Sequence, residues 1–327
     1  MTLSIKEKTS TQIVHLNTIS IEDESFLMTY CPNLNPVITS MREIGLMNPI
    51  ILRGKGQYQV VSGYRRVLAA RSLGWNEIRA TIYAPDELSV AAGFSLNFYE
   101  NLGTRRFNLI EAAMVVRGFT THCGKREKQI REDVLSLLGF QSGNKVLQAL
   151  QALMFLAQEW KELVVKKEIS LLNAAKIASF SLLDQKALYN VLSELKLGEN
   201  KLREVLVMAE EICKREKISP SGLFASESFT SLGQDGELNT AEKTEQFRKA
   251  LKARRFPEFT RLEEQFFEYK KKLSLPPQIR LSPPEYFEGD KLKVTFGFRS
   301  SEEFRFILEK LETAADNEVL KNLLMIL

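Results

Sequence analysis

The chain has few of the residues that build disulfide frameworks or metal clusters. Its 327 residues include three cysteines and two histidines. The cysteines, Cys31, Cys123 and Cys213, lie far apart without a C-x-x-C spacing, which argues against a disulfide scaffold or a zinc knuckle. His15 and His122 are too few for a histidine-rich metal site. We therefore expect reduced thiols with no structural role.

Long apolar segments are also missing from the sequence. No run approaches the roughly 20 apolar residues that a membrane-spanning helix needs, and the start of the chain lacks the apolar core of a secretory signal. We therefore expect a cytoplasmic protein with no membrane partner. The net charge of +4 mildly favours an anionic partner. The length favours two or three domains over a single core.

The first hundred residues alternate between strand and helix patterns. Glycines follow both candidate helices, as is common at helix ends, and a Gly-Lys-Gly turn separates two candidate strands of a hairpin. We expect strands at 13–16, 49–52, 58–61 and 78–83, and helices at 35–44 and 64–73.

The rest of the chain changes character twice. Apolar residues recur at three- and four-residue spacing from about 89 to 213, which predicts an almost wholly helical region. Residues 220–240 are rich in Ser, Gly and Asp and predict a flexible linker. After it we expect a charged helical segment at 241–273 interrupted at Pro257, a strand between two proline pairs, a half-buried strand at 292–298, and helices at 301–311 and to the end. The predicted domains are 1–100, 101–219 and 241–327, joined by the linker 220–240.

One strand-to-helix junction has the features of a phosphate site. The candidate strand ends at Gly63 and a helix begins directly after it. Free N–H groups and the helix dipole attract anions at such a junction. Gly63 permits close backbone approach, and Arg65 and Arg66 carry guanidinium groups suited to phosphate oxygens. The alternative is that both arginines are solvated helix residues.

A second pattern, between Gln129 and Met154, is typical of a helix-turn-helix. A first helix at about 130–138, a turn at Gly139 and a second helix capped by Ser142 fit this motif. The early residues of the second helix would face the major groove of DNA. These candidate DNA-binding residues are Ser142, Gly143, Asn144, Lys145 and Gln148. The alternative is a plain pair of packed helices.

Three segments together resemble the ParB family. The segment Ser62-Gly63-Tyr64-Arg65-Arg66 is similar to the family's Gly-Glu-Arg-Arg motif. The segment from Ser40 to Ile50 resembles its Ser-Ile-x-x-x-Gly-x-x-x-Pro-Ile motif. Glu100-Asn101-Leu102, followed by Asn108-Leu109-Ile110-Glu111, resembles its Glu-Asn-Leu and Asn-Pro-Ile-Glu motifs. Their common order and spacing make the resemblance specific over about 36–205.

The resemblance implies a fold of the α+β class. It consists of a small mixed α/β ParB/sulfiredoxin-like N-terminal domain, an all-helical helix-turn-helix middle domain and a small α/β C-terminal module. In the family the first domain binds CTP. The resemblance therefore implies that CTP or another nucleotide is held by its phosphates at Ser62, Gly63, Tyr64, Arg65 and Arg66. Glu100 and Asn101 would lie near the phosphates and Mg²⁺, for which oxygen ligands are suitable.

Two departures from the family pattern concern the chemistry of the site. Tyr64 stands where the family usually has Glu, a residue linked to nucleotide hydrolysis, and a neutral phenol cannot replace a carboxylate as base or metal ligand. The family's Pro-x-Gln-Pro-Arg motif is not recognisable between Ile21 and Leu34. The catalytic residues are therefore unknown, and the choice between a weak CTPase and binding without hydrolysis stays open.

The function that this resemblance implies is plasmid or chromosome partition by a nucleoid- or plasmid-associated protein. A nucleotide would gate the clamping of a homodimer on double-stranded DNA, with a partition ATPase as a further partner. The strand and helix at 291–311 resemble the family's dimerisation module, although docking on the chain's own domain is an equal alternative. A transcriptional regulator without nucleotide use and a metal-dependent nuclease are the other functions considered.

Overall fold

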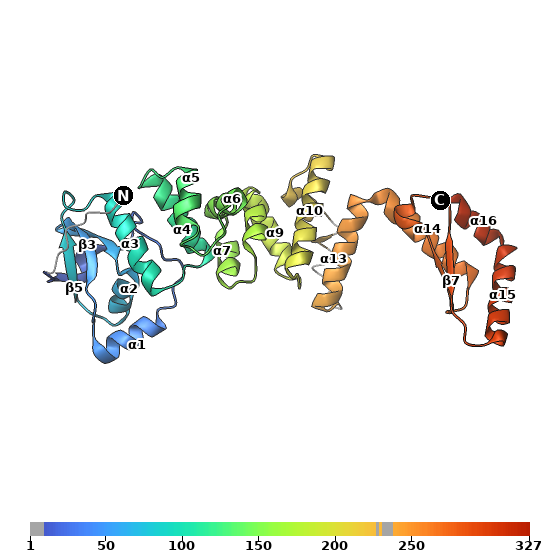
Figure 1. Cartoon of the computed structure of the whole chain (residues 1–327), viewed down its shortest axis with the longest axis horizontal. Coiled ribbons are helices and arrows are strands. Elements are labelled where there is room, and N and C mark those ends of the chain that lie inside the picture. Colours follow the sequence, from blue (N-terminus) through green and yellow to red (C-terminus); the bar gives the residue numbers. More distant parts are fainter. Residues whose placement is uncertain (1–9, 227–228, 231–237) are drawn as a thin grey trace. The chain divides into compact units, whose positions relative to one another are not determined.

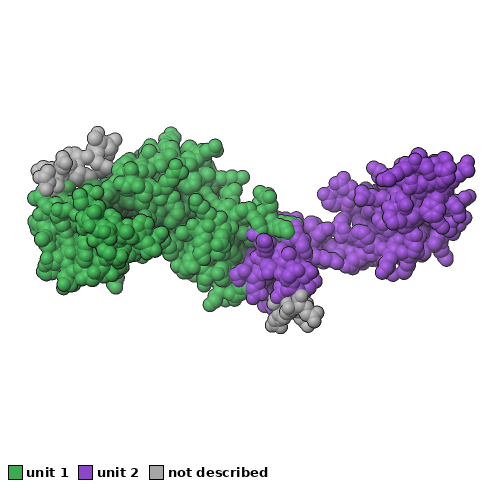
Figure 2. Space-filling model, turned by 90° about the horizontal axis from the view of Figure 1, so that it is seen from below, with its two compact units in different colours: residues 1–190, 198–206 green, residues 191–197, 207–327 purple. Residues whose placement is uncertain are grey.

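The computed structural model describes residues 10–226, 229–230 and 238–327 (Figure 1). The chain divides into two compact units, shown in separate colours in Figure 2. Unit 1 comprises residues 1–190 and 198–206, and unit 2 comprises 191–197 and 207–327. This division differs from the four segments expected from the sequence, whose boundaries stay a prediction.

Unit 1 begins with a mixed five-stranded sheet of order β1-β5-β3-β4-β2. Strands β3 and β4 form the expected antiparallel hairpin, while β5 runs parallel to β3 and antiparallel to β1. The short β2 pairs in parallel with β4. The strands are β1 (Gln12–His15), β2 (Ile19–Ser20), β3 (Ile50–Lys55), β4 (Gln57–Ser62) and β5 (Glu77–Tyr83).

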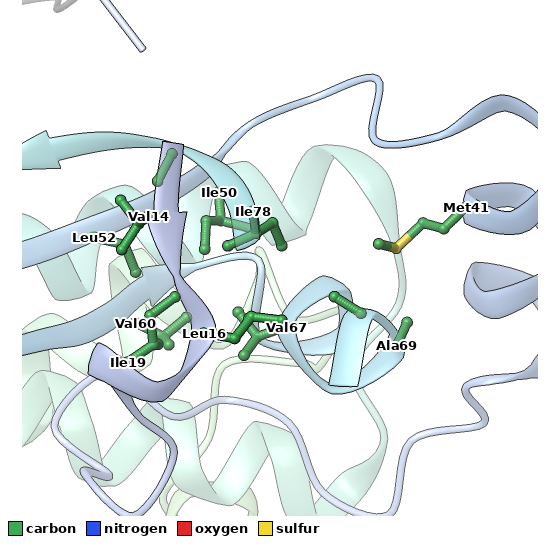
Figure 3. Close-up of a cluster of buried hydrophobic side chains, with 12 residues drawn as sticks. Val14, Leu16, Ile19, Met41, Ile50, Leu52, Val60, Val67, Ala69 and Ile78 are labelled. Atoms are coloured by element: carbon green, nitrogen blue, oxygen red, sulfur yellow. The ribbon is translucent and has the colours of Figure 1, made fainter. Parts of the chain in front are cut away.

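Two helices, α1 (Asn35–Ile44) and α2 (Tyr64–Ser72), pack against the sheet and complete its hydrophobic core. Val67 of α2 and strand residues such as Ile50 are completely buried in one apolar cluster, which Figure 3 shows with Met41 of α1. The expected strands and helices of this region are confirmed, with α1 at its predicted bounds. Strand β2 was not predicted, because two residues are too few to show a strand period.

The remainder of unit 1 is helical, as predicted. Its helix α4 packs against α3, α6 and α7, and α6 also packs against α8. The helical segments are α3 (Val90–Thr104), α4 (Leu109–Thr121), α5 (Glu127–Gln129), the π-helix η2 (Ile130–Val134), α6 (Asn144–Ala152), η3 (Leu153–Phe155), α7 (Gln158–Val165), α8 (Leu171–Ala178) and α9 (Leu182–Leu192); α10 (Glu199–Glu216) contributes to both units.

Aromatic rings fill the space between α3 and α4. The rings of Phe94 and Phe98 each meet Phe119 edge-on, with centroids 5.3 and 5.0 Å apart. Gly118 makes this close packing possible, because a Cβ at that position would lie 1.9 Å from the ring of Phe94. The pair α3–α4 is therefore held at a fixed separation beside the sheet.

Unit 2 contains helices and a two-stranded antiparallel sheet of β6 and β7. The expected helical segment is interrupted at Pro257, which begins α14 in a position where proline is tolerated. The elements after α10 are α11 (Pro220–Phe224), α13 (Thr240–Arg255), α14 (Pro257–Leu273), β6 (Ile279–Ser282), η4 (Glu285–Phe287), β7 (Lys293–Phe296), α15 (Ser301–Ala315) and α16 (Glu318–Met325).

Two predictions for this region need correction. Residues 220–224 of the expected linker are helical, because Phe224 packs on Phe229 and Phe247 in a buried aromatic cluster; linker residues 227–228 and 231–237 lie outside the described residues. A strand is present where one was expected at 292–298, but the prediction that it is half-buried is wrong, because all four residues of β7 are exposed. Within the described part of the chain, no helix combines the length and apolarity required to cross a membrane.

Candidate functional site

A cavity of about 440 Å³ lies where the sheet, α1, α2 and α3 meet. Its volume falls in the usual range of small-molecule pockets, about 300–1,000 Å³. The lining includes three arginines against two carboxylates, so positive charge predominates. The charged lining residues are Arg65, Arg66, Arg105, Asp23 and Glu100.

Gly63 forms one edge of this cavity, between β4 and α2. Its backbone has a φ of 97° and a ψ of 20°, a left-handed conformation that glycine adopts readily. A Cβ at this position would also lie 2.7 Å from Cγ2 of the buried Ile50. The first N–H groups of α2 have no partner within the helix by its geometry. The predicted strand–glycine–helix junction is thus confirmed as a structural feature.

Arg66 points from α2 to α3. Its Nη2 donates to Oε1 of Glu100 over 3.0 Å, and its Nη1 donates to the carbonyls of Asn48 and Pro49. The hydroxyl of the buried Ser62 donates to the other oxygen of Glu100 over 2.6 Å. The Glu100 side chain is 37% exposed, so it keeps a solvent-facing side. Ser62, Arg66 and Glu100 therefore form one polar group at the cavity wall.

Arg65 points instead towards the buried Glu111 of α4. Its Nη2 lies 3.4 Å from Oε1 of Glu111, a long ion pair, and the Glu111 side chain is only 1% exposed. The Nε of Arg65 is buried and has no hydrogen-bond partner among the described residues. An unsatisfied buried donor on a cation is costly. Arg65 therefore has an unpaired donor that an anion could satisfy if the partly exposed side chain turned toward the cavity.

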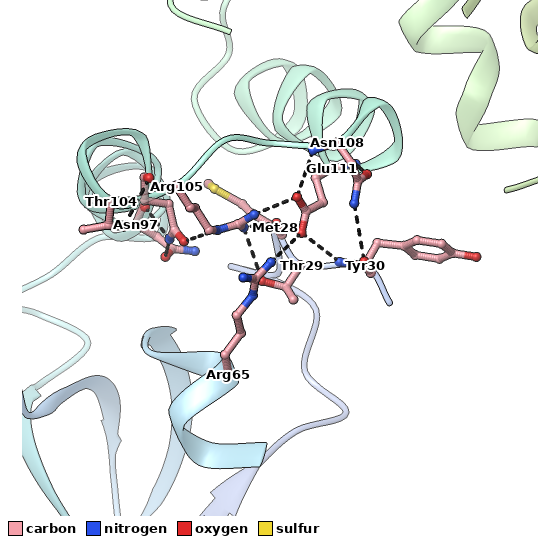
Figure 4. A network of polar contacts seen from close by, with 10 residues as sticks. Met28, Thr29, Tyr30, Arg65, Asn97, Thr104, Arg105, Asn108 and Glu111 are labelled. Atoms are coloured by element: carbon pink, nitrogen blue, oxygen red, sulfur yellow. Dashed lines mark hydrogen bonds and ion pairs between the residues drawn. The ribbon is translucent and has the colours of Figure 1, made fainter. Parts of the chain in front are cut away.

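A ladder of side chains along α3 leads to the same carboxylate, as Figure 4 shows. The amide of Asn101 donates to Asn97, and its oxygen accepts from Nε of Arg105 over 2.7 Å. Arg105 then donates through Nη1 to Oε2 of Glu111 over 2.6 Å. Burial lowers the pKa of the Arg105 guanidinium, an effect that the neighbouring Glu111 opposes. Glu111 also closes the capping box of α4 with Asn108.

The segment before α1 forms another wall of the cavity. Its carbonyls are held from α3 and its C-cap residue, because Asn97 donates to Phe26 and Arg105 donates to Met28. Farther along, the N–H of Tyr30 donates to Glu111, and the Tyr30 hydroxyl donates to Gln158 of α7. Both Phe26 and Met28 are buried. This wall is thus fixed by long-range contacts with the helices.

Asp23 stands at the start of this wall. Burial alone would raise its pKa, but hydrogen bonds from Gln59 and Ser25 hold the pKa of the carboxyl below its usual value. The carboxylate therefore stays ionised at neutral pH, and it accepts from Gln59 over 2.6 Å.

The structure brings all seven nucleotide-site residues expected from the sequence to one region, with different roles. Six of them line the cavity: Gly63, Tyr64, Arg65, Arg66, Glu100 and Asn101. The seventh, Ser62, is buried behind Glu100.

Sequence reasoning did not include Asn97 and Arg105 in this site. The four-residue spacing of Asn97, Asn101 and Arg105 places them on one helix face and could have identified them.

The two expected metal ligands differ in their suitability. The oxygen of Asn101 already accepts from Arg105, so only its second lone pair would be left for an ion. Glu100 faces the cavity and offers hard oxygen atoms, but it pairs with Arg66. In the described part of the chain, no group of three or more His, Cys, Asp and Glu side chains could hold a metal ion. A magnesium ion would thus need phosphate oxygens to complete its coordination.

The candidate DNA-binding segment has an irregular first helix. The expected first helix at about 130–138 is confirmed in part: the π-helical segment η2 spans Ile130–Val134 after the short α5, and turns follow to Gly139. Gly139 has a φ of 83°, as its expected turn position requires. The expected cap is wrong. Gly143 precedes α6 without a side-chain cap, and Ser142 donates to the carbonyl of Arg131 instead.

Helix α6 and the two residues before it carry the candidate DNA-binding residues. Ser142, Asn144, Lys145 and Gln148 are exposed, and Gly143 is half-buried. The opposite face is buried through Leu147, Ala149 and Leu150. The polar face is thus open to a partner, and its contact with DNA stays a prediction.

Comparison with known proteins identifies the first part of the chain. Residues 4–101 match the family model of the ParB N-terminal domain. A nucleoid occlusion protein of Geobacillus kaustophilus is 32% identical over 83 residues, which cover 25% of this chain and 28% of that protein. A probable chromosome-partitioning protein ParB of Coxiella burnetii is 28% identical over 102 residues, covering 31% and 34%. The chain therefore matches about a third or less of these relatives' lengths.

Solved structures of ParB proteins are also similar to the chain. The C-terminally truncated ParB of Caulobacter crescentus complexed to the centromeric parS site is 19% identical, with a TM-score of 0.32 over 61% of this chain and 98% of that chain. The same protein complexed with CTP-gamma-S is 22% identical, with a TM-score of 0.26 over 55% and 97%. The family model supports the sequence resemblance over residues 4–101, which match the ParB N-terminal domain.

Proposed function

We propose that the protein is a ParB-like DNA-binding protein for chromosome or plasmid partition. A nucleotide, CTP in the first instance, would bind in the cavity beside Gly63 and gate the clamping of the protein on DNA. The observation that carries this proposal is the arginine-lined cavity, whose lining comes mostly from the residues that match the ParB N-terminal domain. The protein would lie in the cytoplasm, in association with the nucleoid or a plasmid.

The geometry of the cavity supports a polyphosphate ligand. The start of α2 offers backbone N–H groups beside Gly63, where the helix dipole favours negative charge. Arg65 and Arg66 follow directly, and Nε of Arg65 lacks a hydrogen-bond partner among the described residues. If the Arg65 side chain turned toward the ligand, a phosphate oxygen could satisfy this buried donor; phosphate would also neutralise the excess positive charge of the lining.

Magnesium would enter this site together with the nucleotide. Glu100 is the residue that would hold it, because its carboxylate faces the cavity and is partly exposed. The ion would neutralise phosphate charge near this carboxylate. Asn101 would serve the site by holding Arg105, unless its amide oxygen leaves that hydrogen bond.

The proposed DNA interface lies on α6. Asn144 and Gln148 offer amide groups that can read base edges, and Lys145 suits guanine or phosphate. All three are exposed. Helix α6 packs on α4, whose Glu111 contacts Arg65 of the cavity. The two proposed sites are thus linked by contacts within unit 1, which supports gating of one by the other.

A homodimer would form through the C-terminal strand and helix. Strand β7 pairs with β6 along one edge only among the described residues, and its side chains are exposed. Phe298 is 54% exposed and Phe306 is 44% exposed nearby in the chain. A second copy of the chain could extend this sheet and cover these rings. Such an exposed edge is otherwise a risk for aggregation.

Calorimetric titration with CTP, ATP and GTP in the presence of magnesium tests the proposal. We expect binding by the wild type and a loss of roughly tenfold or more in affinity for Arg66→Ala, because one charged hydrogen-bond partner of phosphate is worth about 1.5–3 kcal/mol. Arg42→Ala, at an exposed position of α1 outside the cavity lining, is the matched control. If no nucleotide binds, with or without DNA, the nucleotide-gated function is refuted.

A second function receives support from the relatives. The nucleoid occlusion protein of Geobacillus kaustophilus is 32% identical in the matched region, and that of Geobacillus thermodenitrificans is 35% identical over 77 residues. A role of that type would use the same nucleotide and DNA sites. Mapping the DNA sites that the protein occupies in cells separates the two functions. Sites clustered at a few loci support partition, and many dispersed sites support nucleoid occlusion.

A further inference from the structure

Two arginines share one buried carboxylate at the back of the cavity, and they share it unequally. Arg105 approaches Oε2 of Glu111 to 2.6 Å, whereas Arg65 stays 3.4 Å from Oε1. Figure 4 shows both guanidinium groups directed at Glu111 from different elements. Arg105 is therefore the closer counter-ion of this carboxylate.

Arg105 lines the cavity, but four of its five N–H donors already have partners in the protein. Nε donates to Asn101, Nη1 to Glu111, and Nη2 to the carbonyl of Met28 and, at 3.4 Å, to the hydroxyl of Thr29. Its side chain is only 12% exposed. Without breaking this network, a ligand in the cavity could reach at most the one remaining N–H of Arg105.

Arg65, in contrast, is held only loosely by the protein. Its side chain is 31% exposed, its contact with Glu111 is long, and its Nε has no hydrogen-bond partner among the described residues. It also lies in the first turn of α2, next to Gly63. Arg65 is thus the cation that can turn to an anionic ligand.

The availability of Arg65 depends on Arg105 by simple electrostatics. A carboxylate that is 1% exposed requires a close cation, because an uncompensated buried charge is strongly unfavourable. While Arg105 supplies that cation, Arg65 is not needed. Without Arg105, the nearest remaining cation is Arg65, which would close its 3.4 Å gap and withdraw from the cavity.

We propose that Arg105 is a positioning residue that neutralises Glu111 and thereby keeps Arg65 available to the polyphosphate of the ligand. This inference rests on the proposed function, since it assumes a polyphosphate in the cavity. It assigns Arg105 no direct contact with the ligand. It also assigns Glu111 the role of an internal competitor for Arg65.

A double-variant titration tests the inference. Inorganic tripolyphosphate and CTP are titrated into the wild type, Arg105→Gln, and the double variant Arg105→Gln/Glu111→Gln. We expect Arg105→Gln to weaken both ligands about tenfold, within the range of coupling between neighbouring charged residues. The double variant should recover to within about threefold of the wild type, because Arg65 is no longer drawn to a carboxylate. Arg106→Gln, at the adjacent exposed position, controls for the loss of one positive charge.

The outcomes separate three roles of Arg105. If Arg105→Gln binds both ligands as tightly as the wild type, Arg105 does not position Arg65 and the inference is overturned. If the double variant stays as weak as Arg105→Gln, the residue binds the ligand directly or only supports the fold, and the inference is overturned as well. Absence of binding by the wild type would refute the proposed function, a result distinct from both.

A further variant covers the case in which Arg105→Gln does not fold. Glu111→Gln alone keeps the side-chain size, and Gln can still close the capping box of α4. Removing the competitor should leave tripolyphosphate affinity equal to or higher than that of the wild type. A loss of tenfold or more in a folded Glu111→Gln variant would show that Glu111 supports binding, and it would overturn the inference.

Discussion

Replacing Gly63 by alanine tests the structural basis of the cavity most directly. Two separate costs are expected at this position. The left-handed backbone at φ 97° costs a residue with a Cβ about 1–2 kcal/mol. The added Cβ would also lie 2.7 Å from Ile50, a fully buried residue of β3. Overpacking of this kind typically costs about 1–3 kcal/mol.

The two costs together predict that Gly63→Ala lowers the free energy of unfolding of unit 1 by roughly 2–5 kcal/mol. Gly74→Ala is the matched control, because Gly74 also has a positive φ, 73°, but no atom lies within 4 Å of the point that a Cβ would occupy there. It should show the backbone cost alone. The difference between the two variants then measures the contact with Ile50.

Denaturant unfolding followed by fluorescence provides the measurement. The chain has two tryptophans, and Trp75 packs against the sheet cluster. In a Trp160→Phe background, the emission therefore reports this part of unit 1. If Gly63→Ala loses no more stability than Gly74→Ala, the steric argument is wrong, and glycine would be needed at 63 only for its backbone conformation.

Three further predictions concern other parts of the chain. Gly118→Ala should destabilise unit 1 by about 1–3 kcal/mol in thermal unfolding, because its Cβ would meet Phe94 at 1.9 Å; a stabilised variant, as helix propensity alone predicts, would contradict the packing. Burial raises the pKa of Tyr30 from 10.0 to about 12, so the free energy of unfolding should fall between these pH values as the unfolded state ionises first. Tyr30→Phe should lack that part of the pH dependence, and an unchanged profile would contradict the assignment. Lys145→Ala should reduce the salt dependence of duplex binding by about one unit of slope in anisotropy titrations, and an equal slope would remove Lys145 from the interface.

The sequence predicted local structure well where one short segment determines it. Helix α1 ends before Gly45, and the hairpin of β3 and β4 turns through glycines with positive φ. The strand–glycine–helix junction at Gly63 was likewise visible from neighbouring residues. These features depend on local conformational preferences, which a single sequence displays.

The sequence could not show how distant segments meet at the site. Arg65 and Arg66 are neighbours, yet one reaches α4 and the other α3, since adjacent helix positions point in different directions. The wall from Phe26 to Tyr30 has no periodic pattern, and hydrogen bonds from residues about 70 to 80 positions away hold it. The role of Arg105 arises from the same long-range contacts.

The position of Glu111 has a consequence for how the protein can be divided. The family match ends at residue 101, but the buried carboxylate and its closer counter-ion, Arg105, follow that boundary. A fragment cut at residue 101 would keep Gly63 and Arg65 and would lose the charges that set the state of Arg65. The smallest piece that retains the complete site is therefore longer than the recognised domain and includes the beginning of α4.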